Sequence, residues 1–338
     1  MILIDSIYIN NSGGKILLDF LVDEIEKRNL NAFYLFDQRI SGSFSSVPKE
    51  RKIYLKATFI NRLKFYLKNR SSFEKILCFG NIPPPIKVYS DVYTYFHQRL
   101  FLELPGEANI YTKSIFFIKS VILGLFRNNT NFWLVQSEQM TKSLIKRYNV
   151  LEKKVVVLPF YPKINEVVTY KKEKTHDSFV YVSNGSPHKN HVRLLRAFRT
   201  FYNTHKRGAL HLTLSEGSSK ELMAELEDLT AMGYPVYNHG FVEREQLAEL
   251  YMSNNFTIYP SLSESFGLGI MEAIECGCQV IGADLPYMHA VCEPSIVFDP
   301  YSEDSIVAAL EKAVFGAYKP SKLLVRNQID DLLNLISS

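Results

Sequence analysis

The sequence is poor in cysteine and tryptophan, with four cysteines and one tryptophan among 338 residues. The cysteines show no Cys-x-x-Cys spacing, so the pattern predicts neither a paired-thiol metal site nor a dithiol redox motif. We expect Cys276 and Cys278 to fill small buried slots instead. The N-terminal run Met-Ile-Leu-Ile-Asp lacks the basic region and cleavage site of a signal peptide, which favours a reduced, cytoplasmic protein.

Two patterns that accompany nucleotide chemistry are also missing. The fingerprint Gly-x-Gly-x-x-Gly does not occur, and its absence disfavours a nicotinamide enzyme. Asp-x-Asp does not occur either. Clustered carboxylates of that type normally hold Mg²⁺ or Mn²⁺ on a diphosphate. We therefore expect any diphosphate chemistry to proceed without an essential metal.

Composition agrees with a soluble, globular enzyme. Hydrophobic residues make up 46% of the sequence and charged residues 22%, and a chain of this length predicts two domains. The charge is uneven, because residues 1–166 carry a net charge of +10 and residues 167–338 a net charge of −6. The N-terminal half is therefore the part expected to meet an anionic partner.

Two basic, apolar segments are candidates for contact with a membrane surface. In residues 51–70, lysines and arginines alternate with aromatic and aliphatic side chains, a mixture that can lie in a membrane interface. Residues 113–127 have fewer apolar residues than the ~20 that span a bilayer, and they could equally form a core helix. No nucleic-acid-binding motif accompanies the charge, so no nucleic acid partner is expected.

Strand-like apolar runs alternate with helical patterns along the chain, which predicts parallel, doubly wound α/β sheets. In the N-terminal half these runs lie at residues 2–9, 32–36, 75–79, 92–96 and 132–136. In the C-terminal half they lie at residues 178–183, 210–214, 236–238, 256–259, 279–282 and 295–298. We expect an N-terminal domain over 1–165, a C-terminal domain over 166–320, and a helix at 321–338 that could pack back on the N-terminal domain.

The most informative segment joins a predicted strand at 256–260 to a helix that begins near 267–269. A helix N-terminus offers backbone N–H groups and the positive end of the helix dipole, which suits a diphosphate. Glu264 and Glu272 lie on either side of this start. Since carboxylates repel phosphate, they are better explained as acceptors for sugar hydroxyls. The segment predicts a site for a nucleoside-diphosphate sugar.

The stretch from Tyr259 to Cys278 resembles retaining glycosyltransferases of family 4, whose signature is Glu, seven residues and Glu before a Glu-Ala-small-small-Cys/Gly-Gly run. Here it reads Glu264-Ser-Phe-Gly-Leu-Gly-Ile-Met-Glu272-Ala-Ile-Glu-Cys-Gly277. The resemblance implies the α/β GT-B fold, two Rossmann-like domains facing each other across a deep cleft. It implies that Glu264 contacts the donor sugar and Glu272 the ribose. The diphosphate would bind the backbone N–H groups of Ser265, Phe266, Gly267 and Leu268.

The resemblance also implies site residues in other segments. Gly13 and Gly14, between the first strand and helix, correspond to a glycine-rich loop that faces the donor phosphate and the acceptor. His97, after the strand at 92–96, would donate a hydrogen bond to a hydroxyl of the transferred sugar. Phe241 lies in a segment that cradles the nucleotide base through backbone contacts, which leaves UDP and GDP as alternatives.

Lys189 corresponds to a family lysine that clamps the donor diphosphate, where a cation neutralises charge on the departing nucleotide. Ser183 or Asn184 stands where an arginine is usual. His188, Arg193 or a backbone N–H could replace that arginine. The loss of one cation also leaves room for a weak or inactive enzyme.

Together these features predict a retaining, metal-independent hexosyltransferase that uses a UDP- or GDP-sugar and a saccharide or lipid-linked saccharide acceptor. Bacterial lipopolysaccharide, O-antigen or capsule synthesis at the cytoplasmic face of the inner membrane would fit the basic N-terminal half. Two alternatives remain open. One is a nucleotide-sugar 2-epimerase on the same fold, and the other is a scaffold that binds nucleotide sugars without turnover.

Overall fold

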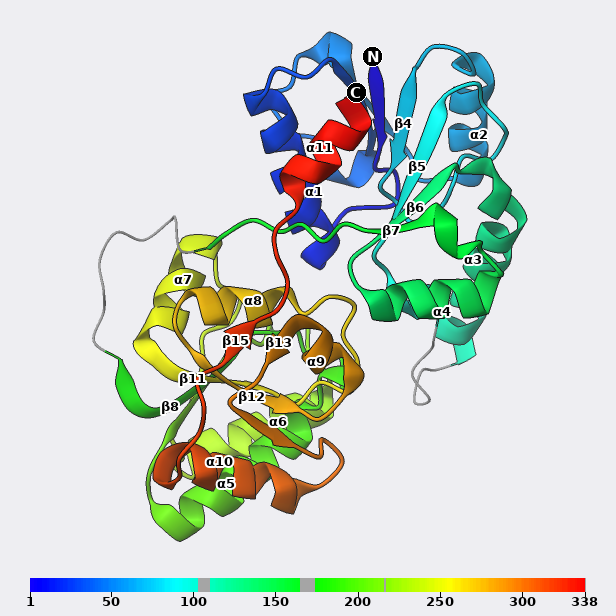
Figure 1. Ribbon diagram of the computed structural model, residues 1–338. Coiled ribbons are helices and arrows are strands. Elements are labelled where there is room, and N and C mark those ends of the chain that lie inside the picture. Colours follow the sequence, from blue (N-terminus) through cyan, green and yellow to red (C-terminus); the bar gives the residue numbers. More distant parts are fainter. Residues whose placement is uncertain (103–109, 165–173, 216, 338) are drawn as a thin grey trace. The chain divides into compact units, whose positions relative to one another are not determined.

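The computed structural model describes residues 1–102, 110–164, 174–215 and 217–337. The chain forms two compact units. Unit 1 comprises Met1–Pro162 and Arg326–Ser338, and unit 2 comprises Lys163–Val325. The domain boundary that we expected between residues 165 and 166 lies outside the described residues. The C-terminal segment from Arg326 belongs to unit 1 (Figure 1).

Unit 1 is built on a seven-stranded parallel sheet with the order β3-β2-β1-β4-β5-β6-β7. The strands are β1 (Ile2–Asp5), β2 (Ala32–Asp37), β3 (Lys52–Leu55), β4 (Lys75–Cys78), β5 (Asp91–Phe96), β6 (Phe132–Val135) and β7 (Val155–Val157). The helices are α1 (Ser12–Lys27), α2 (Phe59–Lys68), α3 (Ile110–Phe126), α4 (Glu138–Tyr148) and α11 (Ile329–Ser337). Helix α1 begins at Ser12, so Gly13 and Gly14 lie inside it rather than between the first strand and the helix, as we expected.

Apolar side chains on one face of this sheet hold α2, α3 and α4. Phe65 and Tyr66 of α2 pack with Leu3 of β1 and Ile76 of β4. Leu123 of α3 and Leu144 of α4 pack with Trp133 of β6 in a neighbouring cluster. Thr58 and Ser137 cap α2 and α4, because each hydroxyl accepts the N–H three residues further on. Both helices are thereby fixed where they follow the ends of β3 and β6.

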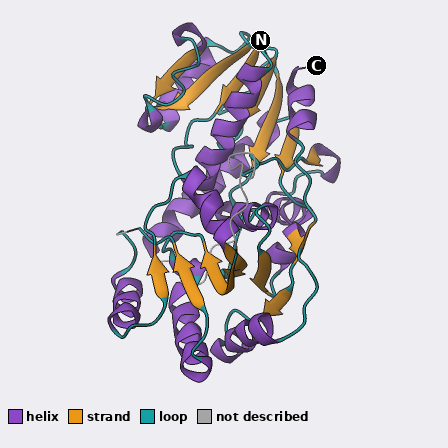
Figure 2. Cartoon of the chain, turned by 90° about the vertical axis from the view of Figure 1, so that its left-hand side faces the viewer, coloured by secondary structure: helices purple, strands orange, loops and turns teal. Residues whose placement is uncertain are grey.

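Unit 2 is built on a six-stranded parallel sheet with the order β10-β9-β8-β11-β12-β14. Its strands are β8 (Thr175–Tyr181), β9 (Ala209–Leu212), β10 (Val236–Asn238), β11 (Asn254–Tyr259), β12 (Gln279–Ala283) and β14 (Ile296–Phe298). The helices are α5 (His191–His205), α6 (Lys220–Ala231), α7 (Arg244–Ser253), α8 (Leu268–Glu275), α9 (Pro286–Val291) and α10 (Glu303–Phe315). Helices lie on both sides of the sheet (Figure 2). An antiparallel pair, β13 (Cys292–Glu293) and β15 (Lys322–Leu323), completes the unit.

None of the four cysteines is exposed, and none of the described helices suits a membrane span. All four cysteines are buried free thiols, and Cys276 and Cys278 belong to an apolar cluster with Ala273. The expectation that these two residues fill buried slots is confirmed. Among the described residues, no helix is both long enough and apolar enough to cross a membrane.

One cation of the basic segment 51–70 points inward. Arg62 of α2 is 3% exposed, and its guanidinium lies 2.8 Å from the fully buried carboxylate of Asp5 on β1. Arg62 also donates to the backbone carbonyls of Ile82 and Pro83, and Tyr66 donates its hydroxyl proton to Asp5. A buried ion pair persists only when further hydrogen bonds satisfy both partners, as they do here. Arg62 is therefore part of the core and does not contribute to the positive surface charge that we expected of residues 51–70.

Replacing Arg62 with alanine would leave the Asp5 carboxylate buried without its cation. We expect the variant to lose about 3–5 kcal/mol of unfolding free energy, measured by urea denaturation. The matched control is Arg70→Ala, because Arg70 is exposed and its guanidinium donates to the Lys87 carbonyl; we expect it to cost about 1 kcal/mol or less. Similar losses for the two variants would contradict the inward role of Arg62.

Candidate functional site

The loop between β11 and α8 carries the predicted strand-loop-helix site. Gly267 precedes α8 with φ 73°, in the left-handed region that favours glycine, and a Cβ there would lie 2.9 Å from Ile270 Cδ1. A Cβ on Gly269 would lie 2.0 Å from the Tyr259 hydroxyl. Both glycines are thus required by local geometry. Gly269 lets the first turn of α8 pack against the side chain of Tyr259 at the end of β11, with the N–H groups of that turn toward the loop.

Lys189 and Glu264 meet beside this loop. Lys189 ends a short 3-10 turn (Pro187–Lys189) after β8, and its Nζ lies 2.7 Å and 2.9 Å from the two carboxylate oxygens of Glu264. Their side chains are only 14% and 11% exposed. Two predicted site residues that lie 75 positions apart in the sequence are therefore in contact. A partly buried pair of this kind is weakly screened by salt.

Hydrogen bonds from neighbouring hydroxyl groups fix the position of Glu264. Ser261 donates to the Glu264 carboxylate at 2.7 Å, and the Tyr181 hydroxyl lies 2.6 Å from Ser261 Oγ. Tyr181 also donates to the backbone carbonyl of Lys189, and Tyr287 of α9 donates to that of Ser261. The ends of β8 and β11 are thus joined by one network. The Glu264 carboxylate and the Lys189 ammonium group are therefore held in contact by their surroundings.

Glu272 is held by a residue that the sequence did not single out. It lies in the first two turns of α8, is 4% exposed, and its Oε1 accepts from Arg244 at 2.9 Å. Burial raises the pKa of Glu272 to about 7, while Arg244 opposes that rise and Glu275 adds to it. Because Arg244 and Glu272 are 28 residues apart, no local sequence signal could have paired them.

Asn184 stands at the position where an arginine is usual, and its side chain makes a local backbone contact instead. Asn184 is exposed, and its Oδ1 accepts the Ser186 N–H at 3.1 Å. Arg193 donates to the side chain of Asn190 at 2.6 Å and to the Pro300 carbonyl at 3.2 Å. That guanidinium is engaged in joining α5 to the loop after β14. Of the replacements considered, Arg193 is the least suited.

His188 and its neighbour His191 stay uncharged near neutral pH. Burial lowers the pKa of His188, and the charge of Lys189 lowers it further. Burial also lowers the pKa of His191, to about 3. His188 therefore offers a hydrogen-bond group rather than a permanent cation, which leaves Lys189 as the charged residue of this loop.

The segment expected to cradle the base follows β10. The Asn238 side chain accepts from the backbone N–H groups of Leu214 and Gly240, and donates to the Leu214 carbonyl. Gly240 has φ 68°, so the chain reverses there without strain. The Phe241 ring is 79% exposed. The backbone of the segment is fixed while Phe241 itself is open to a ligand.

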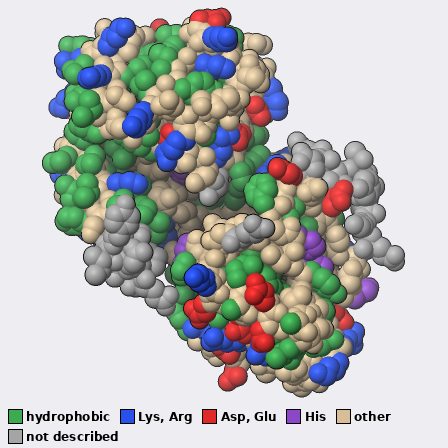
Figure 3. All heavy atoms as spheres, turned by 180° about the vertical axis from the view of Figure 1, so that it is seen from behind, with side chains coloured by type: hydrophobic (Ala, Val, Ile, Leu, Met, Phe, Trp, Pro, Cys, Tyr) green, Lys and Arg blue, Asp and Glu red, His purple; other side chains and the backbone are tan. Residues whose placement is uncertain are grey.

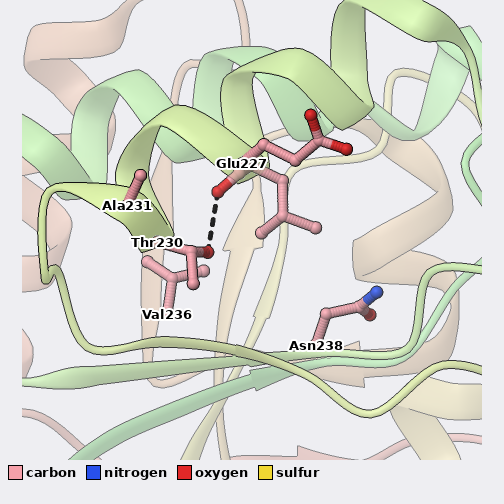
Figure 4. Close-up of a pocket in the computed structure, with 6 residues that line it drawn as sticks. Glu227, Thr230, Ala231, Val236 and Asn238 are labelled. Carbon is pink, nitrogen blue, oxygen red and sulfur yellow. Dashed lines mark hydrogen bonds between the residues drawn. The ribbon is translucent and has the colours of Figure 1, made fainter.

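A pocket of about 480 Å³ lies at a different place in unit 2, between α6 and the sheet edge (Figure 4). It is lined by Leu226, Glu227, Thr230, Ala231, Val236 and Asn238. The Thr230 hydroxyl donates to the Leu226 carbonyl at 2.8 Å. Glu227 is the charged residue of this lining, and a lone carboxylate repels phosphate. The lining of this pocket is therefore poorly suited to a diphosphate.

In unit 1, His97 follows β5 and is 9% exposed. Its Nε2 lies 3.1 Å from the Phe79 carbonyl, and Asn81 accepts its backbone N–H at 2.7 Å. Nε2 also lies 3.3 Å from the side-chain Nδ2 of Asn81, which is a donor, so the contacts to Phe79 and Asn81 call for opposite tautomers of the ring. Burial lowers the pKa of His97 to about 4. The ring is therefore neutral near pH 7.

The two N-terminal glycines have different surroundings. Both lie in the first turn of α1 rather than in a loop before it. A Cβ on Gly14 would lie 3.2 Å from His97 Cε1 and 3.7 Å from Ile9 Cδ1, whereas a Cβ on Gly13 would meet nothing within 4 Å. The structure therefore brings Gly14 and His97 together, and Gly13 lies beside them without contact.

Gln136 is a further polar residue that the sequence did not single out. It follows β6 and is 2% exposed, and among the described residues neither of its amide atoms has a hydrogen bond of good geometry, although the Tyr95 hydroxyl interacts with the amide. The pairing of β5 with β6 aligns Phe96 with Val135, so His97 and Gln136 continue the two strands side by side. A buried amide with so few hydrogen bonds is costly. This amide marks the sheet edge beside His97 as polar.

Comparison with known proteins identifies relatives of the chain. Residues 134–323 match the family model described as glycosyl transferases group 1. The O-antigen chain mannosyltransferase B of Escherichia coli is 33% identical over 132 residues, 38% of this chain and 34% of that protein. The O-antigen chain mannosyltransferase RfbU of Salmonella typhimurium LT2 is 22% identical over 209 residues, 61% of this chain and 58% of that protein. The chain thus spans less than two thirds of the length of these relatives.

Solved structures support the fold. A crystal structure of the Anabaena protein Alr3699/HepE, in complex with UDP and glucose, has 12% identity to the chain and a TM-score of 0.67. The match covers 93% of this chain and 89% of that one. At this identity the likeness shows the fold alone. With the two parallel α/β sheets, it confirms the expected GT-B fold.

Gly14→Ala and Gly13→Ala form a matched pair. The Gly14 methyl group would press on His97, so we expect a lower melting temperature and a displaced His97 ring. Gly13→Ala adds a methyl group in open space within a helix, where alanine is favoured over glycine by up to about 1 kcal/mol. Thermal unfolding and the histidine ring NMR signals measure both effects. Equal behaviour of the two variants would contradict the contact between Gly14 and His97.

Proposed function

The chain belongs to the glycosyl transferases group 1 family, and we propose that it is a retaining hexosyltransferase of bacterial surface polysaccharide synthesis. It would take a nucleoside-diphosphate sugar as donor and a saccharide or lipid-linked saccharide as acceptor. The observation that carries this proposal is the contact between Lys189 and Glu264 beside the N-terminus of α8. The O-antigen mannosyltransferases among its relatives support the biological setting.

In this proposal the donor diphosphate binds between Lys189 and the start of α8. The N–H groups of Ser265, Phe266, Gly267 and Leu268 lie at the positive end of the helix dipole. Lys189 supplies the permanent positive charge. Together they offset the charge that develops on the departing diphosphate. No metal is needed for this balance of charge.

The two glutamates would bind the sugar and the nucleoside. Glu264 accepts hydrogen bonds from hydroxyls of the transferred hexose while Lys189 turns toward the phosphate. Glu272 accepts from the ribose hydroxyls, and Arg244 orients its carboxylate and favours the charged form. Phe241 and the backbone around it contact the base. UDP and GDP both suit this description.

Unit 1 would bind the acceptor, with His97, Gly13 and Gly14 toward the reacting sugar. The neutral ring of His97 would exchange a hydrogen bond with a sugar hydroxyl. In the reaction the bond between the anomeric carbon and the diphosphate oxygen breaks. The acceptor oxygen bonds to the same face of that carbon, and its proton passes to the leaving diphosphate. This front-face attack requires no protein nucleophile.

The setting we propose is cytoplasmic, with peripheral contact between the basic unit 1 and the inner membrane.

One observation favours a second candidate, a scaffold that binds nucleotide sugars without turnover. Asn184, whose side chain accepts the Ser186 N–H, stands where the family usually has arginine. Such a scaffold would bind the donor but neither hydrolyse it nor transfer sugar.

The donor site is tested by thermal unfolding with UDP, GDP, CMP and dTDP. We expect one nucleoside diphosphate to raise the melting temperature, since a ligand at about 100 times its Kd stabilises the native state by roughly 2.7 kcal/mol. The shift should disappear in Glu272→Ala, persist in EDTA, and remain in the control Glu293→Ala, which removes an exposed carboxylate. No shift with any nucleotide at millimolar concentration would overturn the donor-site assignment.

Nucleotide affinity should depend on pH through Glu272. Its pKa of about 7 means that the carboxylate gains a proton as the pH falls through neutrality, and a protonated carboxyl accepts ribose hydroxyls less well. We expect the Kd from calorimetry to rise between about pH 8 and pH 6. Arg244→Ala should move the midpoint to higher pH because Arg244 favours the charged form. A Kd for wild type that stays as flat as that for Glu272→Gln would contradict this role.

A further inference from the structure

Helix α3 presents a continuous apolar stripe to solvent. Leu123 on its inner side belongs to the core of unit 1. On the outer side, Phe117, Ile118, Val121 and Leu125 are 62%, 58%, 46% and 71% exposed. Their spacing places them on one helical face. The helix is therefore neither the buried core helix considered from the sequence nor long enough to span a bilayer.

Helix α2 extends this surface. Its outer residues Ile60 and Leu67 are 62% and 60% exposed, and Lys64 lies between them at helical spacing. The Phe59 ring of α2 stacks on Phe126 of α3, with centroids 5.9 Å apart. The outer faces of the two helices thus form one surface, which we call the docking face.

Cations surround the docking face. Lys56, Lys64, Lys68 and Arg70 on and beside α2 are exposed, as are Lys119 and Arg127 of α3 and its C-terminal end. The sequence contains no acidic residue between Glu50 and Glu74, nor between Glu107 and Glu138. In the space-filling view, Lys and Arg side chains are interspersed with hydrophobic ones over unit 1 (Figure 3). The partner must therefore accept apolar side chains within an anionic border.

We propose that the docking face binds the surface of an anionic lipid bilayer, with the apolar stripe inserted among acyl chains and the cations on headgroups. The inference rests on the proposed function, because a lipid-linked acceptor would be presented at such a surface. A second copy of the chain fits less well, since pairing would bring two basic borders together. Nucleic acid also fits less well, because the four large apolar side chains would gain little binding free energy against it.

The chemistry of the face predicts two separable contributions. Apolar insertion depends on the area buried and is insensitive to salt. The lysines and arginines interact with headgroups over about a Debye length, roughly 10 Å at 0.1 M ionic strength. Binding should therefore need anionic lipid, weaken with salt, and fail when either the apolar or the basic part is removed.

The test is co-sedimentation of the full chain with vesicles of equal parts phosphatidylcholine and phosphatidylglycerol. We expect wild type to partition onto these vesicles at least tenfold more strongly than onto pure phosphatidylcholine. Phe117→Ser combined with Leu125→Ser, and Lys64→Glu combined with Lys68→Glu, should each lower partitioning tenfold or more. The control Leu151→Ser removes an apolar side chain that is 59% exposed elsewhere in unit 1, and it should bind like wild type.

Three results would overturn the proposal: no binding of wild type to the anionic vesicles, serine variants that bind as well as the control, or a dimer in sedimentation velocity that the serine variants dissociate. Circular dichroism establishes that each variant is folded. The nucleotide-dependent melting shift of the same variants separates the two proposals. A protein that binds nucleotide but not vesicles contradicts the docking face alone, and one that binds vesicles but no nucleotide contradicts the donor site alone.

Discussion

The contact between Lys189 and Glu264 is the constraint on which the candidate site depends. It joins the ends of β8 and β11, and it places a cation and an anion within hydrogen-bond distance beside a helix N-terminus. Removing two charges from water is costly, so the pair needs other partners, and Ser261 supplies one. A ligand with both phosphates and hydroxyls can satisfy the ammonium and the carboxylate at the same time. That dual character is what favours a nucleoside-diphosphate sugar.

Unit 2 contains a second ion pair of this kind, in which Arg244 is the cation and Glu272 the anion. Each glutamate of the motif therefore has a basic partner from another segment of the same unit. The pairs explain how a unit with a net negative sequence charge can hold an anionic ligand. The charge that matters to a phosphate is local, and here it comes from Lys189 and the dipole of α8. The excess positive charge of unit 1 is left for another partner.

The sequence predicted the features that depend on local spacing. The strand-loop-helix around Glu264, the parallel sheets and the buried cysteines all follow from patterns within a few residues, and the structure confirms them. Contacts between distant segments could not be predicted. Arg62 looked like a surface cation because its partner Asp5 lies 57 residues away. Arg244 escaped notice for the same reason, and the exposed stripe of α3 resembles a core helix until its neighbours are known.

The most direct test is calorimetric titration of nucleoside diphosphates and their hexose conjugates, among them UDP-glucose, UDP-galactose and GDP-mannose. Loss of a charged hydrogen bond costs about 1.5–3 kcal/mol, so Lys189→Ala should weaken both the bare nucleotide and its sugar conjugate by roughly 10-fold or more. Glu264→Ala should remove only the additional affinity that the sugar provides. The account would be contradicted if both variants bound like wild type, or if Glu264→Ala weakened the bare nucleotide as much as Lys189→Ala did.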